Sequence, residues 1–432
     1  MTTGENDRPR PTRRGFLSGT AGLTALVGAN LAPASARALD APPIADAASD
    51  VTPFWGAHQA GVVTPAQTNT YIATFDLTTT KRADLAALLR RWTEAAAALS
   101  EGRPVEIPAQ GDDYEAQADP SDVAGLSPAR LTITFGFGLG LFEKDGADRY
   151  GLRAQRPAAF IDLPHFPGEQ LVPARTGGDL LVQACADNPQ IAFHAVRQLA
   201  RLAYGVADVR WVQAGFVSDF GPGKTPRNLM GFKDGTGNPA IADPKEMDAV
   251  VWVGDEGPEW MRGGAYTVVR RARIALEHWD RMKVAFQEQT FGRQKMSGAP
   301  LGAKSEFDPL DLDAKDANGD PATPENSHVA IAHRMAQDGS RILRRSYSYN
   351  DGANFTAERW PPWRQGMEFD AGLIFICHQR DLANGFVKIF SKMSRFDMMN
   401  QFVTNVGGGH FAIPRGAAKG EYIGQRLFEA AT

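Results

Sequence analysis

The amino-acid sequence predicts an α+β fold, in which strands and helices alternate but pairs of strands also follow one another directly. Apolar and polar residues alternate with the period of a strand in 70–77 and in 130–138, whereas 81–100 has the period of a helix. The order of elements then starts again in the second half of the chain, after a glycine-rich loop. We therefore expect a duplicated α+β unit, built as a sandwich rather than as a doubly wound parallel sheet.

The N-terminus has the features of an export signal. Residues 12–17 read TRRGFL, and a short apolar stretch and Ala-x-Ala triplets follow them. The pair Arg13 and Arg14 resembles a twin-arginine signal, which directs already folded proteins to export. We therefore expect residues 1–38 to be a cleavable signal and 39–52 to be a linker. The protein is then expected in the periplasm, in the cell envelope or outside the cell.

The first half of the mature chain, 53–222, contains two expected helices. Ala and Leu, which are strong helix formers, dominate 81–100. The second helix is expected in 187–205, where Asn188 can accept a hydrogen bond at the helix start and a glycine can end the helix. Residues 209–216 follow as another strand.

The second half, 223–432, repeats this alternation. We expect strands in 250–254, 265–276, 341–349 and 371–379, and helices in 278–295 and 382–394. The acidic stretch 307–327 is expected to be a solvated loop, because its acids lack the spacing of a calcium-binding loop. We place the boundary between the two halves near residue 222.

The composition is that of a soluble globular protein with a substantial core, because 43% of the residues are hydrophobic and 22% are charged. A net charge of -4 favours no nucleic-acid partner. Cys185 and Cys377 each lie in an apolar run, so we expect two separate buried thiols. No CxxC or CxxCH motif occurs, which argues against a cysteine zinc site and against covalently attached c-type haem.

The peptide MGFKDGTGNP, residues 230–239, places Asp234 among three glycines. Glycine adopts backbone angles that are closed to other residues, so this acid is held by a tight loop that can approach a bulky group. A simple turn with an Asx-type hydrogen bond explains the same pattern. The residues of the loop alone leave both interpretations open.

A second candidate is His328, which follows a long polar loop and opens an apolar segment. An imidazole in such a position can offer one nitrogen to a metal while a partner holds the other, although a structural role is the alternative. Arg344 and Arg345 lie together on an expected strand. No nucleophile elbow, P-loop or dinucleotide motif follows a suitable strand. An acid and an arginine without a nucleophile suit chemistry that is carried by a cofactor.

Nine segments, in their order along the chain, resemble the dye-decolourising peroxidase family. They are FWGAHQAGVVTPAQ, LTITFGFGLGLF, HFPGEQL, GGDLLVQACADNPQIAFHAVRQL, NLMGFKDGTGNP, SHVAIAH, ILRRSYSYNDG, GLIFICHQ and VGGGHF. The chain is most similar to the exported bacterial subgroup that includes the iron-uptake-associated deferrochelatase/peroxidase. The resemblance implies two ferredoxin-like domains, 53–222 and 223–432, that form a β-sandwich-like core flanked by helices. It also implies haem b, bound non-covalently in the C-terminal domain.

The resemblance assigns two residues to catalysis. Asp234 belongs to the GxxDG signature and matches the distal acid of the family, and Arg344 matches the distal arginine. An ionised carboxylate can take a proton from the inner oxygen of peroxide and return it to the outer oxygen. An arginine stays charged and can stabilise the negative charge that develops on the departing oxygen.

Four further residues are expected to bind the cofactor. By the resemblance, His328 is the proximal ligand of the haem iron, and Asp397 is the acid that hydrogen-bonds it. A strong acceptor on the ring would give the ligand imidazolate character. Leu373 and Phe375 match the apolar residues over the distal face of the haem.

The chain departs from the family after the proximal histidine. Where the family often reads HVRLANPR, this sequence reads HVAIAHRM, with Ala330 and His333. The missing arginine is expected to change the contacts to a haem propionate, and His333 is a second candidate ligand. We expect His328 to be the ligand, because Ser327-His328-Val329 fits the position of the motif.

The expected function is therefore that of a haem peroxidase, which reduces hydrogen peroxide and oxidises dyes, phenols or other aromatic one-electron donors. Tyr347, Tyr349, Trp360 and Trp363 are candidate electron relays, with packing roles as the alternative. The alternative function is that of a haem-handling deferrochelatase of iron uptake, which binds haem and releases its iron. Other expected partners are the twin-arginine export machinery and iron-uptake proteins. The sequence leaves open whether the chain forms a homo-oligomer.

Overall fold

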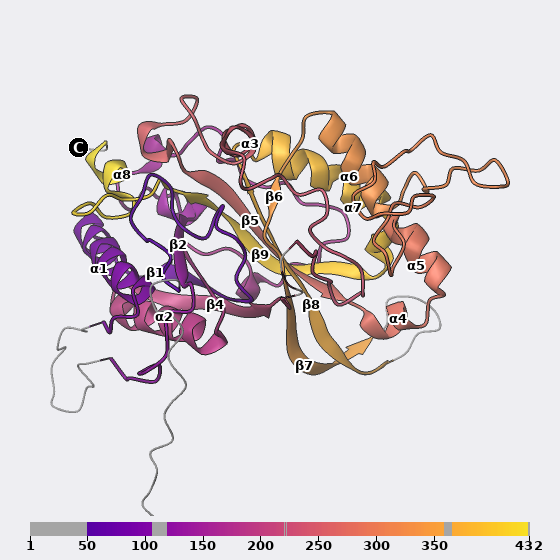
Figure 1. Ribbon diagram of the computed structural model, residues 1–432. Helices are drawn as coiled ribbons and strands as arrows, with labels where there is room; N and C mark the ends of the chain where they lie inside the picture. Colours follow the sequence, from indigo (N-terminus) through magenta and orange to yellow (C-terminus); the bar gives the residue numbers. More distant parts are fainter. Residues whose placement is uncertain (1–49, 106–118, 220, 222, 358–364, 431–432) are drawn as a thin grey trace, which may run out of the picture. The chain divides into compact units, whose positions relative to one another are not determined.

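Antiparallel strands of one sheet organise the described part of the chain (Figure 1). The computed structural model describes residues 50–105, 119–219, 221, 223–357 and 365–430, all within one compact unit, 46–432. The expected signal 1–38, most of the linker 39–52, and the candidate relays Trp360 and Trp363 lie outside the described residues.

The first half forms a four-stranded sheet that two helices cover (Figure 1). Its elements are β1 (Asn69–Leu77), α1 (Arg82–Ser100), β2 (Thr132–Phe137), η1 (Leu139–Leu141), η2 (Arg153–Gln155), η3 (Pro173–Arg175), β3 (Leu180–Ala186), α2 (Pro189–Ala203) and β4 (Ala207–Phe216). The strands lie in the order β2-β3-β1-β4. This is the expected ferredoxin-like arrangement, in which each helix connects strands of one sheet.

The second half has the same plan with more insertions. Its elements are α3 (Pro244–Val250), η4 (Glu259–Met261), β5 (Ala265–Ile274), α4 (Leu276–Asp280), α5 (Val284–Phe291), α6 (His328–Gln337), β6 (Leu343–Arg344), β7 (Tyr347–Ala357), β8 (Gln365–Gln379), η5 (Ala383–Val387), α7 (Lys388–Phe396), η6 (Met398–Gln401), β9 (Val403–Ile413) and α8 (Gln425–Glu429). Strand β5 pairs with β9 on one side and with β8 on the other. Strands β7 and β6 both pair with β8.

The two half-sheets meet at both ends. Phe137 of β2 pairs with Ala412 of β9, and Phe216 of β4 pairs with Ser348 of β7. Because β5 bridges β9 and β8, these two seams close the sheet on itself. One cluster of buried side chains takes members from both halves, among them Ile72, Leu181, Val269, Ile374, Ile376 and Phe411. The expected α+β, sandwich-like core is confirmed.

The predictions for single elements were mostly right in the first half. Helix α2 begins as expected, since the Asn188 side chain accepts a hydrogen bond from the backbone N–H of Gln190. The strand expected in 250–254 was wrong, because Asp243 caps a short helix that runs to Val250. The helix expected in 278–295 is divided into α4 and α5, and Gly292, with a φ of 82°, ends the second of them.

Other features agree with the sequence. The acidic stretch 307–327 contains no helix or strand in the described chain. Cys185 and Cys377 are both buried free thiols. Of the helices within the described ranges, none is both long enough and apolar enough to span a bilayer.

A segment of the first half crosses to the second half. This segment, residues 169–178, is called the strap here. The backbone N–H groups of Gln170 and Val172 donate to the carbonyl oxygens of Asn405 and Val406 on β9, each over 2.9 Å. The strap therefore extends the sheet beside β9 and brings a part of the first domain to the second.

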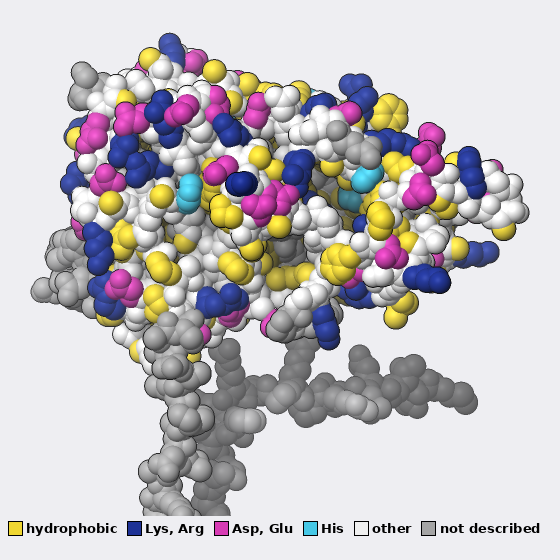
Figure 2. All heavy atoms as spheres, turned by 45° about the horizontal axis from the view of Figure 1, so that its top comes forward, with side chains coloured by type: hydrophobic (Ala, Val, Ile, Leu, Met, Phe, Trp, Pro, Cys, Tyr) yellow, Lys and Arg dark blue, Asp and Glu magenta, His cyan; other side chains and the backbone are white. Residues whose placement is uncertain are grey.

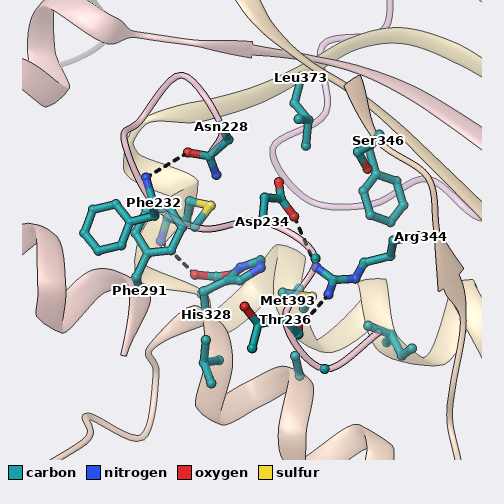
Figure 3. Close-up of a pocket in the computed structure, with 18 of the residues that line it drawn as sticks. Asn228, Phe232, Asp234, Thr236, Phe291, His328, Arg344, Ser346, Leu373 and Met393 are labelled. Atoms are coloured by element: carbon teal, nitrogen blue, oxygen red, sulfur yellow. Dashed lines mark hydrogen bonds and ion pairs between the residues drawn. The ribbon is translucent and has the colours of Figure 1, made fainter. Parts of the chain in front are cut away.

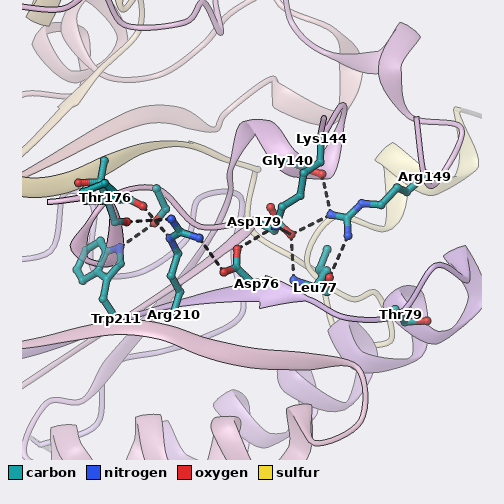
Figure 4. Close-up of polar contacts among 12 residues, drawn as sticks. Asp76, Leu77, Thr79, Gly140, Lys144, Arg149, Thr176, Asp179, Arg210 and Trp211 are labelled. Atoms are coloured by element: carbon teal, nitrogen blue, oxygen red, sulfur yellow. Dashed lines mark hydrogen bonds and ion pairs between the residues drawn. The ribbon is translucent and has the colours of Figure 1, made fainter. Parts of the chain in front are cut away.

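Charged side chains hold the far end of the strap (Figure 4). Arg210 donates to the carbonyl oxygens of Thr176 and Pro173 and forms an ion pair with Asp76 at 2.8 Å. The side chain of Trp211 donates to the carbonyl of Gly177. These contacts fix the far end of the strap to β4 and β1, while β9 holds the strap at both ends.

Candidate functional site

A pocket of about 360 Å³ lies in the second half, a size that is usual for a small-molecule or cofactor site. It lies between the glycine-rich loop, helices α6 and α7, and one face of strands β5, β8 and β9. All of the residues that the sequence predicted for the site line this pocket: Asp234, His328, Arg344, Leu373, Phe375 and Asp397. Basic and acidic side chains are mixed over the face shown in Figure 2, so charge there favours neither anionic nor cationic molecules.

The loop that carries Asp234, residues 225–239, is called the glycine loop here. Gly231 and Gly235 have φ values of 86° and 128°, which side chains other than glycine rarely adopt. The backbone N–H of Asp234 donates to the carbonyl of Pro226 at 2.8 Å. The acid is therefore held by its backbone, and its side chain is one-quarter exposed, toward the pocket.

Arg344 lies next to Asp234 in the pocket (Figure 3). One of its guanidinium nitrogens is 3.4 Å from Asp234 Oδ1, and the other donates to the carbonyl of Thr236 at 3.1 Å. The side chain of Asn238 donates to the Arg344 carbonyl and accepts from its N–H. The glycine loop is thus fastened to β6 through both the backbone and the side chain of the arginine.

A buried carboxylate, Glu306, supports the other side of the glycine loop. It forms an ion pair with Lys233 and accepts hydrogen bonds from the hydroxyls of Thr225 and Thr236. Burial raises the pKa of Glu306. The hydrogen bonds from Lys233, Thr225 and Thr236 together lower it by more than burial raises it, so the net pKa lies below its ordinary value. Glu306 is therefore an ionised group that joins residues on both sides of Asp234.

His328 enters the pocket from the first turn of α6. Its Nδ1 lies 2.6 Å from Asp397 Oδ2, and the other oxygen of Asp397 accepts from the backbone N–H of Met399. The backbone N–H of Met398 also donates to the Asn326 carbonyl, which ties the two segments together. Because Nδ1 is occupied, Nε2 is the ring nitrogen that a metal would take. A carboxylate on the opposite nitrogen is the usual support of a ligating histidine.

His333 also lines the pocket, five residues further along α6. The Asp397 carboxylate lies on His328. His328 and Asp397 thus form the arrangement of carboxylate and imidazole that suits a metal ligand.

The walls of the pocket are mainly apolar. Leu373 and Phe375 alternate along β8 and so present their side chains to the same face. Phe386, Phe390 and Met393 line the pocket from η5 and α7. In the view of Figure 3, Leu373 lies above Asp234, whereas His328 and Met393 lie below Asp234. Apolar walls, an imidazole and an acid with an arginine in one pocket fit a haem.

Several polar residues of the site were not found from the sequence. Asn238 lies in the same peptide as Asp234, but it fastens the loop only through its hydrogen bonds with Arg344 of β6. Glu306 is in a distant loop and carries no local signal. Arg270 of β5 lines the pocket and forms an ion pair with Glu169 of the strap at 2.9 Å. This contact joins the two halves, and no local sequence pattern predicts it.

Comparisons with protein families agree with this geometry. The model described as "Dyp-type peroxidase, N-terminal" matches residues 59–217, and "Dyp-type peroxidase, C-terminal" matches residues 225–418. The chain is 36% identical over 457 residues to the dye-decolorizing peroxidase of Thermobifida fusca (strain YX), covering 99% of this chain and 100% of that protein. It is 35% identical over 435 residues to the deferrochelatase of Escherichia coli (strain K12), covering 98% of both.

Solved structures show the same similarity. The oxyferrous complex of DtpA from Streptomyces lividans matches with a TM-score of 0.78 and 38% identity, over 90% of this chain and 100% of that one. A DyP-type peroxidase from Streptomyces coelicolor matches with a TM-score of 0.77 and 39% identity, over the same shares. The similarity therefore covers both half-sheets and the pocket.

Proposed function

The chain belongs to the Dyp-type peroxidase family and is a haem peroxidase, and from this premise we propose that Asp234 and Arg344 activate hydrogen peroxide at a haem held by His328. The observation that carries the proposal is the contact between Asp234 and Arg344, 3.4 Å apart, in the same pocket as the His328–Asp397 pair. When bound, the haem would supply the iron, which takes up the two oxidising equivalents of peroxide and passes them to aromatic donors.

Asp234 is the proton carrier in this proposal. Its carboxylate faces the pocket from a loop that its backbone holds in place, so it can meet a small molecule without rearrangement. It takes a proton from the inner oxygen of peroxide and returns it to the outer oxygen, which then leaves as water. Acid–base help of this kind typically accelerates a reaction by about 10²–10⁴-fold.

Arg344 supplies fixed positive charge. Its guanidinium is positioned by the Thr236 carbonyl and its backbone by Asn238, so the charge is already oriented before peroxide enters. Charge aimed at the departing oxygen stabilises the negative charge that develops there as the O–O bond breaks. A guanidinium also stays protonated at any working pH.

The remaining predicted residues hold the cofactor. His328 offers Nε2 to the iron, and Asp397 fixes the tautomer and orientation of the ring. Leu373 and Phe375 would cover one face of a bound macrocycle with apolar surface. With the haem in this pocket, a bulky dye would give up its electrons from outside it.

The test is single-turnover reaction of the haem-loaded protein with hydrogen peroxide, followed by stopped-flow absorbance. Asp234→Ala should keep the haem spectrum and lose about 10²–10⁴-fold in the rate of peroxide reaction. Arg344→Leu should slow the same step. Asp255→Asn, at a carboxylate whose side chain is 96% exposed, is the matched control and should react normally. Full turnover by Asp234→Ala would refute the proposed role.

A second candidate function is release of iron from haem. It is supported by the similarity to proteins named deferrochelatase, which extends over 98% of the chain. Asp234 and Arg344 favour peroxidase work, because simple carriage of haem needs neither. Product analysis separates the two functions: coupled phenolic products support the peroxidase, whereas intact porphyrin without iron supports the deferrochelatase and iron-uptake partners.

We also propose export by the twin-arginine route, on the basis of Arg13 and Arg14 and the short apolar stretch after them. Replacing both arginines by lysine should retain the protein in the cytoplasm, as measured by cell fractionation. Unchanged export of this variant would remove the support for the route and for a periplasmic, envelope or secreted location.

A further inference from the structure

A cation stands directly beside the catalytic acid in the sequence. Lys233 precedes Asp234 in the glycine loop, and its side chain lines the same pocket. A positive charge so close favours the ionised form of a carboxylate and weakens it as a proton acceptor. Asp234 also faces Arg344. A counter-charge on Lys233 would leave Arg344 as the cation that meets the acid.

Glu306 is the carboxylate that meets Lys233. Its side chain is 7% exposed, and that of Lys233 is 22% exposed, so water screens this pair only in part. Its oxygens also hold the hydroxyls of Thr225 and Thr236, which lie on opposite sides of Asp234 in the loop. One buried anion thus carries out two tasks, namely neutralising a cation and joining the two arms of the loop.

Two other cations around this loop have different partners. Arg227 hydrogen-bonds to the carbonyls of Gly231 and Lys295, and the Lys295 side chain donates to Gln287. Arg293, which lines the pocket, donates to the carbonyls of Gly298 and Glu306, and the charge of the Glu306 carboxylate acts on this guanidinium as well as on Lys233.

Across the pocket, Asp397 is engaged with His328. Among the described residues that these contacts involve, Glu306 is thus the carboxylate placed to balance Lys233.

We propose that Glu306 is a positioning residue of the peroxidase site, which clamps both arms of the glycine loop and balances the charge of Lys233, so that Asp234 stays a strong enough base to accept a proton from peroxide. This inference rests on the proposed function of Asp234. It adds a determinant of the pH range of the reaction that lies outside the GxxDG signature.

The first test compares the pH dependence of the peroxide reaction in Glu306→Gln, in Lys233→Met and in the double variant. Glu306→Gln keeps a hydrogen-bonding group of the same shape but leaves Lys233 unbalanced. The acidic limb of the rate profile should move to lower pH by roughly 0.5–1 unit, with a slower plateau. Lys233→Met should move the limb to higher pH by a similar amount. The double variant should lie near the original protein, because both charges are removed.

The control is Glu256→Gln, which removes the same charge from an exposed ion pair with Arg380 that does not line the pocket. Its profile should coincide with that of the original protein. An unmoved limb in Glu306→Gln, even with a lowered melting temperature, would show a purely structural role and overturn the inference.

A second readout does not depend on turnover. Infrared difference spectroscopy can follow the protonation of the Asp234 carboxyl directly, with its band assigned by its loss in Asp234→Asn. That band should titrate at lower pH in Glu306→Gln than in the original protein, and a coincident titration would contradict the inference. If Asp234→Asn itself reacts normally with peroxide, the proposed function fails. If it is inactive while the Glu306→Gln profile is unmoved, the inference alone fails.

Discussion

Each reactive group of the site is fixed by a group from a distant part of the chain. His328 is held by Asp397, which lies 69 residues later at the end of α7. Both oxygens of Asp397 are used, one by the ring and the other by the N–H of Met399. Since Asp397 is buried, its carboxylate interacts with the imidazole with little screening by water. The ring orientation therefore depends on this one acid.

Asp397→Asn should lower the affinity for haem about 10–100-fold, because the groups that hydrogen-bond a ligating histidine typically contribute that much. Titration of haem-free protein with haem, followed by the Soret band, measures this affinity. His328→Ala is the comparison and should retain far less haem, because it removes the ligand itself. Haem binding by Asp397→Asn equal to that of the original protein would show that the carboxylate does not support the ligand.

At the level of residues, the sequence could reveal the groups that belong to recognisable motifs. Asp234, His328 and Arg344 each lie in a short characteristic segment, and the structure brings all three to one pocket. Glu306 and Asn238 were not assigned a role, because each acts through a hydrogen bond to a residue far away in the chain. Glu306 accepts from Thr236, 70 residues away, and Asn238 donates to Arg344, 106 residues away. A supporting group of this kind has no local pattern that marks it.

At the level of secondary-structure elements, local periodicity succeeded where polar and apolar residues alternate, as in β2, even though all of its residues are buried. Strand β4 has alternating buried and exposed residues and was predicted correctly. Strand β3 was not assigned, because every one of its residues is buried and a continuous apolar run has no period. Strand β9 was also not assigned, since its three consecutive glycines are uncharacteristic of a strand.

The strap is the element that joins the two halves at the pocket. Glu169 of the strap pairs with Arg270 of β5, and the two side chains are only 2% and 5% exposed. Burying two charges is costly unless they remain paired. The guanidinium of Arg270 also lies over the ring of Phe386, another residue of the pocket wall. Loss of this pair should therefore affect the fold more than loss of a surface ion pair.

Glu169→Gln should destabilise the protein by about 3–5 kcal/mol, because it leaves the charge of Arg270 buried without its partner. The double variant with Arg270→Met should regain part of this stability. Urea unfolding followed by circular dichroism measures both. The exposed pair of Arg426 and Glu259 provides the control, since Glu259→Gln should cost no more than about 1 kcal/mol. Equal midpoints for the two single variants would contradict the proposed importance of the buried pair.

At the level of the whole molecule, two similar half-sheets close into one ring through β5 and two narrow seams. The sequence predicted the duplication from the repeated order of elements, but the seams could not be predicted, because each joins strands far apart in the chain. The domain boundary near residue 222 stays a prediction. The second half also buries a polar residue, His378 of β8, which pairs with Thr267 of β5, and this has a consequence for stability in acid.

Burial, with a smaller contribution from Arg345, lowers the pKa of His378 to about 3, whereas an unfolded chain takes up this proton near pH 6.5. Between these values the unfolded state binds a proton that the folded state does not, so stability falls as the pH drops below about 6.5. The free energy of unfolding therefore changes by about 1.4 kcal/mol per pH unit through this residue.

His378→Gln should lose less stability than the original protein between pH 7 and pH 5, as measured by urea midpoints. His165→Gln, at an exposed histidine, should keep the original slope. If His378→Gln also keeps that slope, the acid sensitivity originates elsewhere, and the next candidate is His410, whose pKa burial lowers to about 4.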